Sequence, residues 1–162
     1  VVLPIITIAL SMGTGFPMVF GWGKPVEISL SNPKTRKRID IISTAGGVAM
    51  NLVVAFVSAM LLAVFLLLGW ENMQEVAFQS VYINCVLFVI NMIPIPPLDG
   101  SRFLKYAVDM SEHTYYAISR YGILILLLLV NIPFTASIFM FITRAIASVF
   151  IYAALLVVKL FS

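Results

Sequence analysis

Charged residues are scarce in this chain of 162 residues. Only 10% of them are Asp, Glu, Lys or Arg, and 62% are hydrophobic, whereas about a quarter of a typical soluble domain is charged. A soluble domain of this length cannot bury so much apolar side chain, but a lipid bilayer removes the need to cover it. The composition therefore excludes a soluble globular domain and predicts a single membrane domain in contact with the bilayer.

Cysteine and histidine are almost absent. Cys85 is the only cysteine, which excludes a disulfide within the chain, and its apolar surroundings predict a packing role. His113 is the only histidine. These residues therefore cannot form a zinc site that is built on a pair of histidines.

Long apolar segments are the dominant feature of what is present. Each comes close to the roughly 20 residues that a helix needs to cross the hydrocarbon. The predicted transmembrane helices cover residues 44–70, 76–93, 115–132 and 136–158. Residues 1–12 are too short to span, and we expect them to be part of a further helix whose beginning is absent. The expected fold is an all-α integral membrane protein with about four full transmembrane helices.

The basic residues are unevenly distributed between the predicted loops. Residues 13–42 hold five Lys or Arg residues and residues 99–114 hold two, whereas residues 71–75 hold none. The positive-inside rule therefore places 13–42 and 99–114 in the cytoplasm and 71–75 outside, and Lys159 would then also lie inside. We interpret the basic run at 34–38 as a cluster facing anionic head groups and expect no nucleic-acid partner.

A short strand is predicted within the first loop. Val26, Ile28 and Leu30 alternate with Glu27 and Ser29, which is the period of a strand. An exposed strand edge can pair with an extended peptide, so Val26 and Ile28 are candidate substrate-binding residues. An ordinary turn at the membrane interface is the alternative.

Small residues recur at every fourth position of the first long segment, and Asn51 interrupts them. The stripe consists of Gly47, Asn51, Ala55, Ala59 and Ala63. Small side chains at this spacing allow close packing of helices. Packing explains the alanines but not the asparagine, because polar groups within a membrane are expensive and usually face the bundle interior.

The second segment leads into a run rich in proline. Asn84 and Asn91 share a helix face, and Asn91 begins the run N-M-I-P-I-P-P-L-D-G, which contains Asp99. Prolines end a helix, and broken backbone at membrane depth is tolerated only within protein or beside water. We therefore expect Asp99 in a hydrated pocket near the cytoplasmic face. It would either bind a metal or another ion, relay a proton, or cap a helix that begins near Ser101.

Four segments of the chain resemble motifs of one family. Residues 20–26, F-G-W-G-K-P-V, resemble F-G-W-A-K-P-V, and N-P-K at 32–34 with Arg36 resembles N-P-R-x-x-R. A-G-G-V-A-M-N at 45–51 resembles A-G-P-x-x-N, with Gly47 and a longer spacer. The run at 91–100 resembles N-x-x-P-I-P-P-L-D-G. Together they resemble the site-2 protease family of intramembrane zinc metalloproteases.

The resemblance implies a mechanism. In that family, two histidines of an H-E-x-x-H helix and the aspartate of the L-D-G motif hold one Zn²⁺, and the substrate is a membrane protein. Asp99 matches the third zinc ligand. Asn51 and Asn91 match polar positions near the site that hold the substrate backbone or the transition-state oxyanion. The family also implies an integral protein of the prokaryotic cytoplasmic membrane.

One departure from the family leaves alternatives open. No H-E-x-x-H occurs in these residues, so we expect the chain to be the C-terminal portion of a protease and to be inactive by itself. A non-catalytic membrane adaptor that keeps the fold is the first alternative. A transporter that uses Asp99 as an ion site is the second, although no internal repeat supports it.

Overall fold

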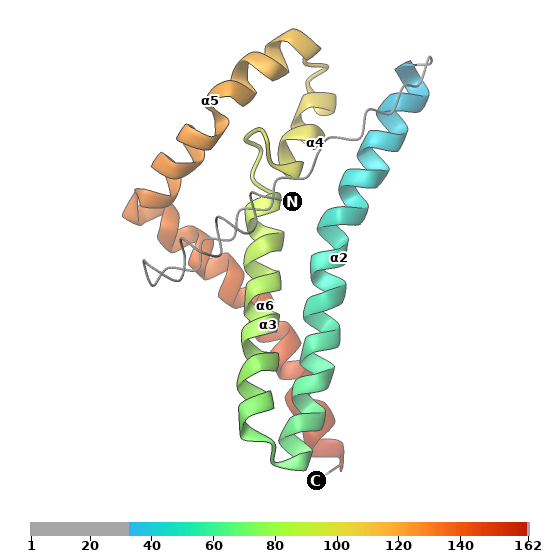
Figure 1. Cartoon of the computed structure of the whole chain (residues 1–162), viewed down its shortest axis with the longest axis vertical. Coiled ribbons are helices and arrows are strands. Elements are labelled where there is room, and N and C mark those ends of the chain that lie inside the picture. The colour runs from blue at the N-terminus through green and yellow to red at the C-terminus, as the bar shows by residue number, and fades with distance from the viewer. Residues whose placement is uncertain (1–32, 162) are drawn as a thin grey trace, which may run out of the picture. The chain divides into compact units, whose positions relative to one another are not determined.

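The computed structural model describes residues 33–161, which form five helices joined by short connections (Figure 1). They are α2 (Pro33–Leu68), α3 (Glu71–Asn91), α4 (Asp99–Ala107), α5 (Glu112–Asn131) and α6 (Pro133–Phe161). No strand occurs among these residues. All but α4 are long and apolar enough to cross a membrane, which confirms the all-helical membrane class. The predicted strand with Val26 and Ile28, and the partial helix at 1–12, lie outside the described residues.

Helix α2 begins earlier than the sequence pattern predicted. It starts at Pro33 and has 36 residues, so residues 33–42, which we expected within a loop, are its first turns. Proline is favoured at the first position of a helix. At 1.5 Å per residue the helix is about 54 Å long, well above the roughly 30 Å of the hydrocarbon. Its basic first turns therefore extend beyond the apolar layer.

The core is built from small side chains of α2, α3 and α6. Ala55, Ala59 and Ala63 of α2 are almost fully buried, with exposures of 0%, 0% and 1%. They pack in one cluster with Val81 and Cys85 of α3 and with two alanines of α6. The alanines of the predicted stripe are thus confirmed as a packing face, whereas Gly47 is exposed and Asn51 half-buried. Cys85 has the packing role that we expected.

A hydroxyl pair sets the register of α2 against α3. The two helices are antiparallel, and Ser58 Oγ lies 2.8 Å from Ser80 Oγ. Both helices rise equally per residue. Gly47, eleven residues before Ser58, therefore lies at about the level of Asn91, eleven residues after Ser80. Asn51 lies one turn deeper towards the centre of the bundle.

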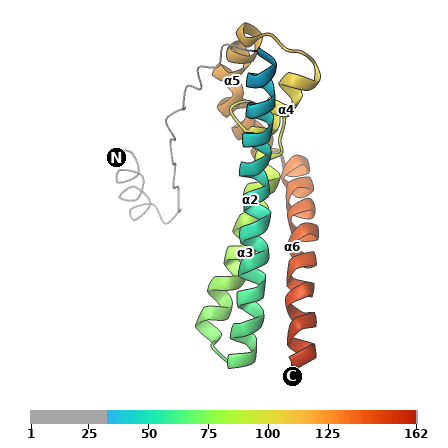
Figure 2. The ribbon, with the colours of Figure 1, turned by 90° about the vertical axis from the view of Figure 1, so that its right-hand side faces the viewer.

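Helix α6 runs in the same direction as α2. Figures 1 and 2 both place the C-terminus beside the α2–α3 connection, at the end opposite to the start of α2. Four successive crossings, as the sequence suggested, would bring Lys159 back to the end where α2 starts. The difference arises at α5, which in Figure 1 runs obliquely away from α4 and reaches only part of the way along the bundle before α6 begins. Only α2, α3 and α6 run along the described bundle.

Candidate functional site

The proline-rich run forms a compact connection between α3 and α4. Helix α3 ends at Asn91, and tight turns follow, with Ile95 N donating to Ile93 O at 2.9 Å and Leu98 N to Ile95 O at 3.0 Å. Gly100 contacts the carbonyl of Met92 so closely that no Cβ would fit there. This contact folds the connection back onto the end of α3.

Asp99 is the first residue of α4, not its cap. The cap position is Leu98, and no side chain makes a capping hydrogen bond there. A carboxylate in the first turn does interact favourably with the helix dipole. The carboxylate of Asp99 therefore does not cap α4, and a capping role does not explain why an aspartate is present here.

The Asp99 carboxylate lies against the backbone of α2 at Gly47. A Cβ built on Gly47 would be 3.7 Å from Asp99 Oδ2, so the absence of a side chain leaves room beside the carboxylate. This contact joins the glycine-rich motif of α2 to the L-D-G motif. The helix register places Asn91 at the level of the same glycine, with Asn51 one turn further along α2.

Asn51 and Asn91 differ from two other asparagines of the membrane helices, Asn84 and Asn131. Asn84 donates to Ser80 O at 2.8 Å, and Asn131 donates to Leu127 O at 2.7 Å, each within its own helix. Asn51 and Asn91 are half-buried, and their amides have no hydrogen-bond partner among residues 33–161. Any hydrogen bond that these amides make is therefore to a group outside residues 33–161.

Asp99 is partly desolvated and lies near one positive and one negative side chain, Arg102 and Asp40. Burial raises the pKa of its carboxyl above the ordinary value, Arg102 opposes that rise, and Asp40 adds to it. The guanidinium of Arg102 pairs with Asp40, and the Tyr106 hydroxyl donates to the other oxygen of Asp40 at 2.6 Å. The guanidinium of Arg102 is thus paired with Asp40 and not with Asp99. Asp99 has no hydrogen bond or ion pair within the described part of the chain.

Sequence reasoning missed Asp40, Arg102 and Tyr106. A signal for Asp40 and Arg102 was present, because Asp40 lies seven residues before Gly47 and Arg102 three after Asp99, so each shares a helix face with a motif residue. Burial also raises the pKa of the Tyr106 hydroxyl, and its hydrogen bond to Asp40 and the charge of Asp40 raise it further. The three side chains fasten α4 to α2 and thereby position Asp99.

A second set of contacts fastens α4 to α5. Lys105 is 7% exposed, pairs with Glu112 at 2.7 Å and lies 5.0 Å from the ring centroids of both Tyr106 and Tyr115. Ser101 Oγ lies 2.9 Å from the Tyr115 hydroxyl oxygen. The short helix that begins with Asp99 is therefore held on two sides.

Residues 33–161 do not complete a zinc site by themselves. They contain no group of three His, Cys, Asp or Glu side chains close enough to hold a metal ion. His113 is exposed. Asp99 can supply one carboxylate oxygen ligand, and structural or catalytic zinc needs at least two more protein ligands.

An apolar cavity adjoins the proline-rich connection. Its volume is about 510 Å³, and only apolar residues line it. Phe88 comes from α3, Met92 and Ile95 from the connection, Leu129 from α5 and Ile142 from α6. A cavity of this kind can accept apolar side chains beside the proline-rich connection.

Comparison with known proteins gives two matches. Residues 67–129 match the family model of Peptidase family M50. The chain is also 29% identical over 122 residues to a Bacillus subtilis (strain 168) protein described as "Putative zinc metalloprotease YwhC". This match covers 70% of the chain and 56% of the relative, so the chain spans about half the length of that protein. No solved structure matches the chain.

Proposed function

The matches to Peptidase family M50 and to a protein named as a zinc metalloprotease confirm the resemblance to the site-2 protease family, and from this premise we propose that the chain is part of an intramembrane zinc metalloendopeptidase. One observation carries the proposal. Asp99, the aspartate of the proline-rich motif, is half-buried against Gly47, and its carboxylate has no partner among residues 33–161.

Each polar residue has a separate role in this proposal. Asp99 contributes one ligand to a single Zn²⁺, and the histidine ligands come from residues that this sequence does not contain. Zinc in such a site lowers the pKa of bound water to about 7. Asn51 and Asn91 donate hydrogen bonds to the substrate carbonyl, where preorganised donors stabilise developing negative charge.

The proposed substrate is the transmembrane or membrane-proximal segment of another membrane protein. The apolar cavity beside the proline-rich connection supports this, because it offers a place for the apolar side chains of such a segment. Val26 and Ile28 remain the candidates for pairing with an extended portion of the substrate.

Exchange of a single carboxylate tests the proposal. Asp99→Asn in the complete natural protein should abolish zinc binding and cleavage of a single-span membrane reporter, because the amide is a poor zinc ligand. Asp109→Asn is the matched control: Asp109 is exposed and has a φ of 47°, a conformation that asparagine tolerates. Zinc content would be measured by atomic emission on the same preparations as cleavage.

The outcomes separate protease from adaptor. Loss of zinc and cleavage in Asp99→Asn, with both retained in Asp109→Asn, supports the protease. Normal zinc content and cleavage in Asp99→Asn would remove Asp99 from the site. Absence of zinc and cleavage from the unmodified protein would favour the non-catalytic adaptor.

A further inference from the structure

Arg144 lies well inside α6, the apolar helix at the C-terminal end of the described residues. Arg144 is eleven residues from the start of α6 at Pro133 and seventeen from its end at Phe161. These separations correspond to about 17 Å and 26 Å along the helix axis. The helix is thus longer than the hydrocarbon layer, which is about 30 Å thick, and Arg144 lies within the part of α6 that would cross this layer. Arginine at such depth is costly and marks a functional contact more often than a structural accident.

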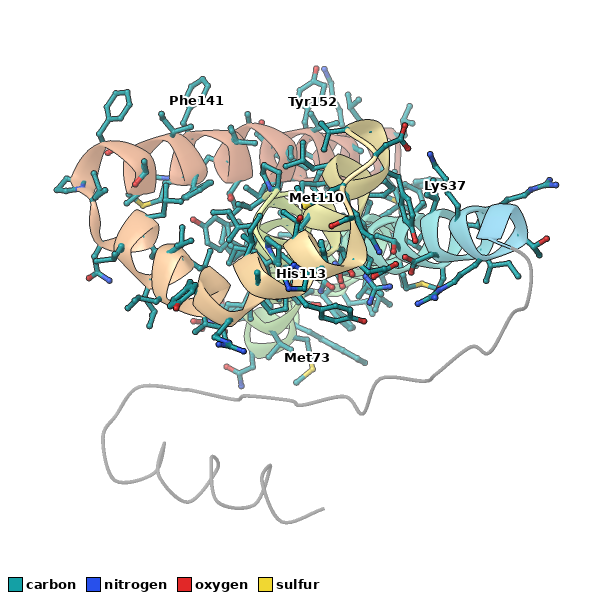
Figure 3. All side chains as sticks on the ribbon, turned by 90° about the horizontal axis from the view of Figure 1, so that it is seen from above. Lys37, Met73, Met110, His113, Phe141 and Tyr152 are labelled. Carbon is teal, nitrogen blue, oxygen red and sulfur yellow. The ribbon has the colours of Figure 1, made fainter. Side chains whose placement is uncertain are left out.

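Arg144 belongs to an exposed helix face that also carries Phe141, Ser148 and Tyr152; we call these four residues the outer face of α6. Their spacings of three, four and four residues place them on one side of the helix. Phe141 is 74% exposed and Tyr152 is 65% exposed, and Figure 3 shows both projecting away from the other helices. The opposite face packs into the core through Ala147 and Ala154.

No carboxylate of the described chain reaches Arg144. It takes part in none of the ion pairs among residues 33–161. The acidic residues of this part all lie near helix ends or in connections: Asp40, Glu71, Glu75, Asp99, Asp109 and Glu112. A second copy of the same bundle would therefore bring no carboxylate from the middle of a helix to meet the guanidinium.

We propose that the outer face of α6 binds a transmembrane helix of another membrane protein, which carries an aspartate or glutamate at the depth of Arg144. Charge complementarity selects this occupant, because ionisable residues within a bilayer pair with one another. Phe141 and Tyr152 supply apolar contact area on either side of the guanidinium. Ser148, a small residue one turn from Arg144, allows close approach of the partner helix. The surface does not depend on the proposed zinc site.

A designed helix can serve as the probe. The full chain with Ser148→Cys is placed in phosphatidylcholine vesicles with a leucine–alanine helix that has one central Glu and a Cys one turn away. A second probe has Gln in place of Glu. Disulfide-linked complex should be about three- to twentyfold more abundant with the Glu probe, given the strength of polar contacts between membrane helices. The chain's own Cys85 is buried.

Substitutions of Arg144 identify the source of the effect. The preference for Glu should vanish with Arg144→Leu and persist with Arg144→Lys. A cysteine at Val64, which is 46% exposed on α2, should capture both probes equally and weakly. Equal capture of the two probes at position 148, or an unchanged preference in Arg144→Leu, would overturn the proposal.

Two further results would assign the surface to another occupant. Disulfide-linked dimers of the chain itself, formed through position 148 in preference to the probe, would show that a second copy covers α6. Increased capture of the Glu probe on Glu27→Gln would show that the chain's own Glu27 occupies Arg144. Either result would overturn the proposal.

Discussion

At the scale of single residues, the asparagines carry the clearest distinction between structure and function. Asn84 and Asn131 satisfy their amides on carbonyls of their own helices. Asn51 and Asn91 do not, although both are half-buried close to Asp99 in the register of the bundle. An idle amide is costly within a membrane, so we expect these two to act on a substrate.

Alanine substitutions separate the two kinds of asparagine. Asn51→Ala or Asn91→Ala should lower the cleavage rate of the complete protein by at least about tenfold, since a donor to an oxyanion is worth about 2.7–4 kcal/mol. Melting temperature and zinc content should change little, because a polar contact between membrane helices averages only about 0.6 kcal/mol. Turnover, metal content and thermal unfolding would be measured on the same samples.

Asn84→Ala is the control, because among residues 33–161 its amide bonds only to Ser80 O. It should leave the cleavage rate per folded molecule unchanged. A loss of stability without a loss of turnover in Asn51→Ala and Asn91→Ala would contradict a catalytic role for these residues.

The packing face of alanines was predicted correctly from sequence, because a four-residue repeat of small side chains stands out in an apolar helix. Asp99 was selected as a carboxylate in an apolar chain, and its role as a ligand stays a prediction. The partners of Asp40 were missed, because Arg102 and Tyr106 meet it only when α4 folds against α2. Such contacts depend on the path of the proline-rich connection, which local patterns do not determine.

At the scale of elements, one glycine allows α5 to approach that connection. Gly122 packs directly on the carbonyl of Pro96, where a Cβ would collide with backbone atoms. The position of α5 against the connection therefore depends on the absence of a side chain at Gly122. The sequence pattern showed α5 as an apolar helix but contained no sign of this contact.

Gly122→Ala should destabilise the protein by about 1–3 kcal/mol, the usual cost of overpacking. Gly46→Ala is a matched control in another helix, since nothing lies within 4 Å of a Cβ there and alanine favours helix by about 1 kcal/mol. Thermal unfolding in detergent measures both. Equal stability of the two variants would contradict the close contact of α5 with Pro96.

The alanine stripe permits a second test at this scale. Ala59 is 0% exposed between α2 and its neighbours, whereas Val57 on the same helix is 51% exposed. Ala59→Leu adds bulk to a close-packed face and should destabilise the bundle by about 1–3 kcal/mol. Val57→Leu should have almost no effect on unfolding in detergent. A comparable loss in both variants would show that the two faces are not distinguished by packing.

At the scale of the whole described bundle, the direction of α6 is the feature that sequence reasoning did not anticipate. Length and hydropathy identify α5 as a candidate span, and alternate crossings then return Lys159 to the cytoplasm. In the structure α6 packs on α2 and α3 through Ala147 and Ala154 and runs parallel to α2 (Figure 2). Helix length and hydropathy alone therefore did not predict the direction of α6.

Labelling of single cysteines distinguishes the two topologies. Cysteines at positions 72 and 159 should react from the same side of sealed vesicles, and a cysteine at position 36 from the other side, because the C-terminus lies beside the α2–α3 connection. The positive-inside rule does not oppose this arrangement strongly, since its signal comes mainly from the basic cluster at the start of α2, and Lys159 is one residue. A membrane-impermeant maleimide, applied before and after permeabilisation, reads the side of each position, and the buried Cys85 should stay unlabelled. Reaction of positions 36 and 159 from the same side would mean that α5 crosses the membrane and that α6 runs antiparallel to α2.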